Sequence, residues 1–79
     1  MSDFPPIASL RSFEAVARLG SVTLAAQELD ISPSAVSHQV RGLEGWLKAP
    51  LFRRAGNRAT LLPHGAALAG ALAGAFSEI

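Results

Sequence analysis

The sequence contains no cysteine and only two histidines, and these shortages exclude several kinds of site. Without cysteine the chain has no disulfide bond, no thiolate zinc site and no cysteine nucleophile. His38 and His64 are too few for a histidine-rich metal site, so we expect neither a metal nor a cofactor. The longest apolar stretch without charge, Gly65–Phe76, is too short to span a bilayer, and we expect no membrane partner.

Length and charge narrow the class of protein and the kind of partner that we expect. At 79 residues the chain is one small domain, with little room for an enclosed substrate cavity. The formal net charge is only +1, yet residues 31–58 carry five basic side chains and one acidic one. A basic segment on an almost neutral chain favours a polyanionic partner. Met1–Pro6 shows no export signal, which predicts a cytoplasmic location.

Hydrophobic periodicity and capping residues predict four helices. Gly20 supplies a left-handed stop for the first helix, and Thr23 can cap the second. Ser32 followed by Pro33 is a strong start signal for the third, and Pro63 opens the fourth. The expected ranges are Ile7–Leu19, Leu24–Leu29, Pro33 to about Lys48, and Pro63 to the end of the chain.

The residues between the third and fourth helices predict a hairpin. Leu51–Arg54 and Ala59–Leu62 read as short strands, and the Gly56–Asn57 pair between them tolerates the positive φ of a tight turn. The predicted fold is therefore mainly α, with three helices and a two-stranded wing over residues 1–62 and a further helix over 63–79.

The third helix has two distinct faces. One is an apolar stripe predicted to be buried, and it consists of Val36, Val40, Leu43 and Leu47. The other is polar and consists of Ser34, Ser37, His38 and Arg41. Short polar groups near a helix start, followed by a cation, suit a helix that enters the major groove of DNA. An ordinary solvent-exposed polar face explains the same pattern and stays open.

Neighbouring features favour the DNA interpretation. A short helix, a three-residue corner and the third helix have helix-turn-helix spacing. The hairpin that follows carries Arg53, Arg54 and Arg58, which can lie on the DNA backbone or in a minor groove. Thr23 can bind a phosphate as well as cap its helix. A solubilised turn and a simple cap are the alternatives for these residues.

Several segments together resemble the N-terminal domain of LysR-type transcriptional regulators. They cover nearly the whole chain, and they are Leu10–Ala17, Gly20–Leu29, Ser34–Val40, Leu43–Glu44, Leu51–Arg54 and Pro63–Gly65. The stretch from Pro5 to Val16 and the Ser-Ala-Val-Ser core are most similar to the branch that includes glycine-cleavage activators.

The resemblance implies the winged helix-turn-helix DNA-binding domain of a bacterial regulator, followed by a dimerising linker helix, with the effector-binding domain absent from this chain. The family's groove-reading positions fall on Pro33, Ser34, Ser37 and His38. Its backbone contacts fall on Thr23, Gln39, Arg41, Arg54 and, on the wing, Arg58. The family often has Gln-Pro where this chain has Pro33-Ser34, and Leu62 stands where a threonine usually caps the linker helix.

The last helix carries an apolar stripe that suits a second copy of the chain. Its members are Leu68, Leu72, Phe76 and Ile79. Two-fold pairing predicts an interrupted inverted repeat in double-stranded DNA. We expect a homodimer, with a higher oligomer of the full-length protein left open, acting at the bacterial nucleoid.

No catalytic constellation is present. A protein-interaction module with the same shape, using the stripe as its working surface, remains the competing class.

Overall fold

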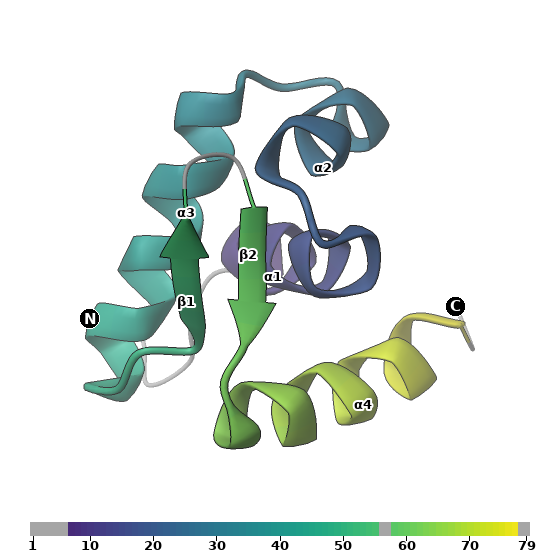
Figure 1. Ribbon diagram of the computed structural model, residues 1–79. Coiled ribbons are helices and arrows are strands. Elements are labelled where there is room, and N and C mark those ends of the chain that lie inside the picture. Colours follow the sequence, from purple (N-terminus) through teal and green to yellow (C-terminus); the bar gives the residue numbers. More distant parts are fainter. Residues whose placement is uncertain (1–6, 56–57, 78–79) are drawn as a thin grey trace.

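The computed structural model describes residues 7–55 and 58–77, and this part of the chain forms four helices and one two-stranded antiparallel sheet (Figure 1). The elements are α1 (Ile7–Leu19), α2 (Val22–Leu29), α3 (Pro33–Leu47), β1 (Phe52–Ala55), β2 (Arg58–Leu61) and α4 (Pro63–Ser77). The mainly helical winged helix-turn-helix class predicted from the sequence is confirmed. The predicted Gly56–Asn57 turn, the side chain of Phe76 and Ile79 lie outside what the structure describes.

The start of α2 corrects the sequence prediction. The N-cap is Ser21, whose hydroxyl accepts from the backbone N–H of Leu24 at 3.2 Å, and Thr23 lies inside the first turn. The predicted Thr23 cap is therefore wrong. Ser21 has an extended backbone (φ −151°, ψ 130°) and forms an antiparallel bridge with Arg58 of the wing. This tertiary pairing holds Ser21 in the extended conformation that a cap residue needs.

Both ends of α3 follow from local chemistry. Ser32 caps the start as predicted, because its hydroxyl accepts from the N–H of Ala35 at 3.1 Å and Pro33 occupies the first turn. The helix ends at Leu47, one residue earlier than expected. Lys48 adopts a left-handed conformation (φ 57°), which a glycine would reach at lower cost. Pro50 then prevents the helix from resuming.

Each strand is shifted by one residue from its predicted range. β1 begins and ends one residue later than predicted, and β2 begins and ends one residue earlier. Phe52 pairs with Leu61 and Ala55 with Arg58. Leu51 falls outside the ladder because its N–H donates to the carboxylate of Glu44 at 2.7 Å rather than across the sheet. The carbonyl of Leu51 still accepts from the N–H of Leu62 at 3.0 Å, so the base of the hairpin remains closed.

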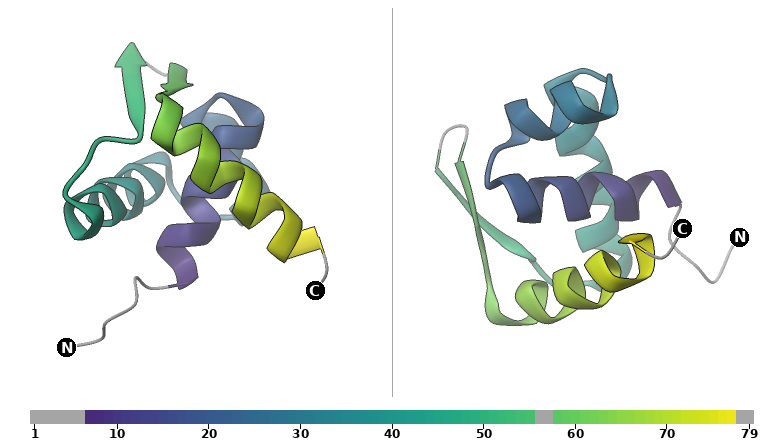
Figure 2. Two further views of the ribbon diagram at one scale, coloured as in Figure 1. Left: turned by 90° about the horizontal axis from the view of Figure 1, so that it is seen from below. Right: turned by 90° about the vertical axis from the view of Figure 1, so that its right-hand side faces the viewer.

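A single apolar core joins the three helices to the base of the wing. Its fully buried members include Phe13 of α1, Val36 and Leu43 of α3, and Leu51 beside β1. The rings of Phe13 and Phe52 pack with centroids 5.3 Å apart. Figure 2 shows α1 between α2 and α4, with α3 crossing it and the wing at one side. The first three helices and the wing thus share one core.

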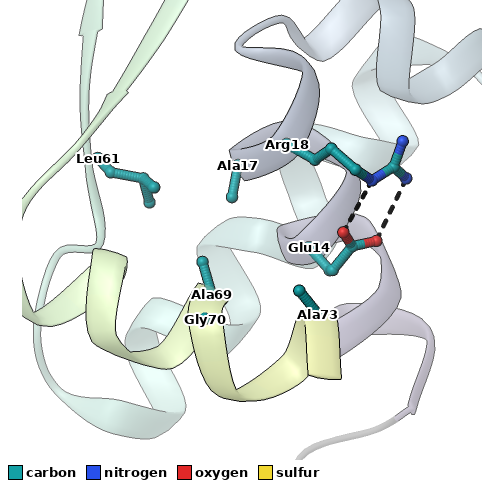
Figure 3. A pocket seen from close by; sticks show the side chains of 7 residues that line it. All are labelled: Glu14, Ala17, Arg18, Leu61, Ala69, Gly70 and Ala73. Atoms are coloured by element: carbon teal, nitrogen blue, oxygen red, sulfur yellow. Dashed lines mark hydrogen bonds and ion pairs between the residues drawn. The ribbon is translucent and has the colours of Figure 1, made fainter. Parts of the chain in front are cut away.

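Helix α4 packs against α1 and β2 through two leucines and several small residues. Leu68, Ala69 and Leu72 are partly buried against the core. A pocket of about 220 Å³ remains between the three elements (Figure 3). Its lining consists of Glu14, Ala17, Arg18, Leu61, Ala69, Gly70 and Ala73. Two members of the stripe assigned to a partner therefore already contact this chain's own core.

Candidate nucleic-acid interface

The outer face of α3 is polar and accessible along its N-terminal two thirds. Val36, Val40 and Leu43 are buried as predicted, and the opposite face turns to solvent. Ser34, His38 and Arg41 are exposed and Ser37 is half-buried. The apolar stripe ends earlier than expected, because the side chain of Leu47 is 38% exposed. Leu47 is the last residue of the helix and lies beyond the core.

The N-terminal end of α3 is suited to an anionic partner. Pro33 and Ser34 are exposed there, and the hydroxyls of Ser32 and Ser34 lie 3.2 Å apart. The first backbone N–H groups of a helix point outward along its axis and carry partial positive charge. In Figure 1 this end of α3 points the same way as the outer ends of β1 and β2. Short side chains here allow close approach of a large ligand.

Two of the predicted contact residues are placed differently from the rest. The carbonyl oxygen of the Gln39 side chain accepts a hydrogen bond from the hydroxyl of Ser12, so Gln39 faces α1 and ties the two helices together. Thr23 is half-buried in the first turn of α2. Arg58 forms its backbone bridge with Ser21 at the same end of α2, so the wing and the start of α2 lie side by side.

The three wing arginines are all exposed but do not form one patch. Successive side chains of a strand point to opposite faces. Arg54 shares a face with the buried Phe52, whereas Arg53 lies on the other face with its cross-strand partner Thr60 and with Arg58. The wing therefore presents two arginines on its outer face and one on the face that turns to the helices.

A further basic residue is neutralised within the chain. The guanidinium of Arg18 donates to Glu14 at 2.9 Å and to Glu28 at 3.0 Å. These hydrogen bonds raise the pKa of Arg18 above its ordinary value, and the bond from Arg18 lowers the pKa of Glu28. The sequence gives one signal for this network, because Glu14 and Arg18 are four residues apart on one helix.

Glu44 has a structural role that the sequence analysis missed. Its carboxylate accepts from the N–H of Leu51 at 2.7 Å and from the N–H of Phe52 at 3.3 Å. One oxygen thus ties the last turns of α3 to the start of the wing. The sequence carries no signal for this contact, because the donors are backbone groups beyond a helix end.

Within residues 7–55 and 58–77, no group of three or more histidine, cysteine or acidic side chains is arranged to hold a metal ion. Over the same residues, no helix is long and apolar enough to cross a membrane.

Comparison with known proteins gives consistent matches over most of the chain. The model of the family "Bacterial regulatory helix-turn-helix protein, lysR family" matches residues 7–66. The HTH-type transcriptional regulator PerR of Escherichia coli is 43% identical over 74 residues, which are 94% of this chain and 25% of that protein. The glycine cleavage system transcriptional activator of the same species is 52% identical over 58 residues, covering 73% of this chain and 19% of that protein.

Solved structures agree with these sequence matches. The BenM DNA-binding domain in its complex with catB site 1 DNA superposes with a TM-score of 0.85 at 29% identity, over 92% of this chain and 81% of that one. The matched relatives are transcriptional regulators, and this chain spans about a quarter of the length of the first of them.

Proposed function

The chain belongs to the LysR family of bacterial helix-turn-helix regulators, and on that premise we propose that it reads double-stranded DNA by inserting α3 into the major groove. The observation that carries this proposal is the exposed polar face of Ser34, His38 and Arg41 opposite the buried stripe of α3. A helix presented in this way fits the major groove, where its early residues meet base edges.

The contacts divide into base readers and groups that position the domain. Base readers are the residues at the start of α3, namely Pro33, Ser34, Ser37 and His38. Phosphate contacts come from Arg41, from Thr23 beside the wing, and from the wing arginines Arg53, Arg54 and Arg58. The carbonyl oxygen of Gln39 already accepts from Ser12, so the amide N–H groups of Gln39 are the donors that we expect to contact DNA.

The wider assembly is part of the same proposal. The winged domain over residues 1–62 binds one half-site, and the helix from residue 63 pairs two copies on an interrupted inverted repeat. Leu68 and Leu72 contribute the surface that their packing on the core leaves accessible, and Phe76 and Ile79 complete the stripe expected from the sequence. The domain has no catalytic activity and no cofactor, and it acts in the cytoplasm at the nucleoid.

Replacing Arg41 by alanine should weaken binding to every duplex alike. A lysine or arginine on a phosphate releases one counterion, so the slope of log K against log salt should fall by about 1 unit. The measurement is affinity for specific and random duplexes over a salt series. Arg41→Lys is the control, because it keeps the charge and should keep the slope. An unchanged slope in Arg41→Ala removes Arg41 from the phosphate contacts.

Ser37→Ala and His38→Ala should change which bases are preferred. Loss of a base-edge hydrogen bond from such short groups is expected to cost about 1 kcal/mol on the preferred sequence and little on others. Competition between the selected site and its single-base variants measures this difference. If affinity falls equally on all sequences, as expected for Arg41→Ala, these two side chains do not read bases.

A further inference from the structure

The end of α3, the base of the wing and the first turn of α4 meet at one short segment, Pro50–Phe52. Glu44 of α3 accepts from the N–H groups of Leu51 and Phe52. The N–H of Leu62, just before α4, donates to the carbonyl of Leu51 at 3.0 Å. The recognition helix and the last helix are therefore connected through the same three residues, although they are distant in sequence.

His64 adds a side-chain contact to this joint between α3, the wing and α4. Its Nε2 atom is hydrogen-bonded to the carbonyl oxygen of Pro50. A carbonyl oxygen only accepts, so the ring must donate, and the Nε2-protonated neutral ring and the imidazolium both do so. Because His64 is the second residue of α4, the bond fixes the helix at its first turn relative to the end of α3.

Gly65 allows the close approach that this bond requires. Gly65 is buried, and a Cβ atom there would overlap the carbonyl oxygen of Leu51 and lie 3.2 Å from Cδ2 of Leu61. The backbone of α4 thus rests directly on the segment whose carbonyl oxygen at Pro50 binds His64. At this point of the joint the two backbones leave no room for a side chain between them.

Beyond its first turn α4 packs on the core through Leu68, Ala69 and Leu72, which are only partly buried. Ala69, Gly70 and Ala73 face α1 across the pocket of about 220 Å³, with the Glu14–Arg18 pair at its edge (Figure 3). Small side chains over a pocket offer few contacts that resist a change in the helix direction. The contacts at the first turn therefore add a constraint on the direction of α4 that these partly buried side chains do not supply by themselves.

We propose that His64 is a positioning residue that fixes the direction in which α4 leaves the winged domain, and thereby the half-site spacing that a pair of chains reads. The proposal rests on the proposed DNA-binding dimer. If α4 pairs two copies, its angle to α3 determines the separation and relative rotation of the two recognition helices. Each added base pair rotates the second half-site by roughly 34° about the duplex, so a fixed angle favours one spacing.

The first test compares spacing preference in three forms of the chain. Duplexes carry two copies of the selected half-site separated by spacers that increase by one base pair. Wild type should vary in affinity by about 30-fold or more across the series, because a rigid pair fits few rotations. His64→Leu removes the donor and fills a similar volume, and its variation should fall to about threefold. His64→Gln places an amide N–H at a similar reach and should restore the preference.

A single half-site separates positioning from a general structural role. His64→Leu should bind it with wild-type affinity, since α3 and the wing are unchanged. A His64→Leu chain that keeps the wild-type spacing preference, or that loses half-site affinity as well, overturns the proposal.

The second test does not depend on DNA. The chain has no cysteine, so Gln27→Cys and Ala71→Cys place spin labels only on exposed positions of α2 and α4. Dilution with unlabelled chain restricts the measured distances to those within one chain. We expect a narrow distribution in wild type and His64→Gln, and a broad one in His64→Leu. Equal widths overturn the role of His64, whereas a wild-type chain that binds no duplex overturns the proposed function.

Discussion

Replacing Gly65 by alanine is expected to lower the free energy of unfolding by about 3 kcal/mol. The added methyl group would overlap the carbonyl oxygen of Leu51, a backbone atom that Leu62 also holds by a hydrogen bond of 3.0 Å. Neither side can move without opening the base of the wing. For a domain of this size, the melting temperature should fall by roughly 12–24 °C in thermal unfolding followed by circular dichroism.

Gly70→Ala is the matched control for this substitution. Gly70 lies in the same helix, and a Cβ atom there would meet nothing within 4 Å. Alanine in an exposed helix interior is more favourable than glycine by about 1 kcal/mol, so Gly70→Ala should raise the melting temperature. Equal melting temperatures for Gly65→Ala and wild type contradict the close contact between α4 and Leu51.

Replacing Phe13 by alanine should cost about 3–5 kcal/mol. The side chain of Phe13 is 0% exposed and packs against Phe52 with ring centroids 5.3 Å apart. Because Phe52 begins β1, the cavity also loosens the wing. A domain of this length has a total stability of roughly 4–12 kcal/mol, so the substitution should remove about a quarter of it or more. Urea denaturation measures the loss.

Phe13→Leu separates cavity formation from the loss of the aromatic pair. Leucine keeps most of the buried volume and should cost about 1.5 kcal/mol. An alanine variant as stable as the leucine variant shows that the core collapses around the smaller side chain. In that case Phe13 does not hold the wing to the helices.

The helices and the polar face of α3 could be predicted because both depend on local rules. Helical periodicity assigns Val36 and Ser34 to opposite faces whatever the rest of the chain does. Caps were harder, since Ser21 and Thr23 have the same capping chemistry two residues apart. The choice was made by a bridge between Ser21 and Arg58, which are 37 positions apart and cannot be paired from sequence.

The remaining differences also involve contacts between distant residues. The hydrogen bond from Ser12 holds the side-chain oxygen of Gln39, a residue predicted to contact DNA, against α1. Alternation along a strand separates Arg53 from Arg54 in the sequence, but which of them faces the core depends on the packing of Phe52. Glu44 accepts from backbone N–H groups, and because every residue except proline has such a group, the sequence does not indicate which ones Glu44 contacts.

Selection of binding sites from a random duplex library at near-physiological salt tests the central claim most directly. The isolated chain should enrich a short motif, single or as an inverted pair. A variant with Ser34, Ser37 and His38 all replaced by alanine should keep salt-sensitive retention and lose or alter that motif. Retention of wild type without enrichment would contradict base reading by α3. No retention at any salt would contradict DNA binding and favour a protein-interaction module.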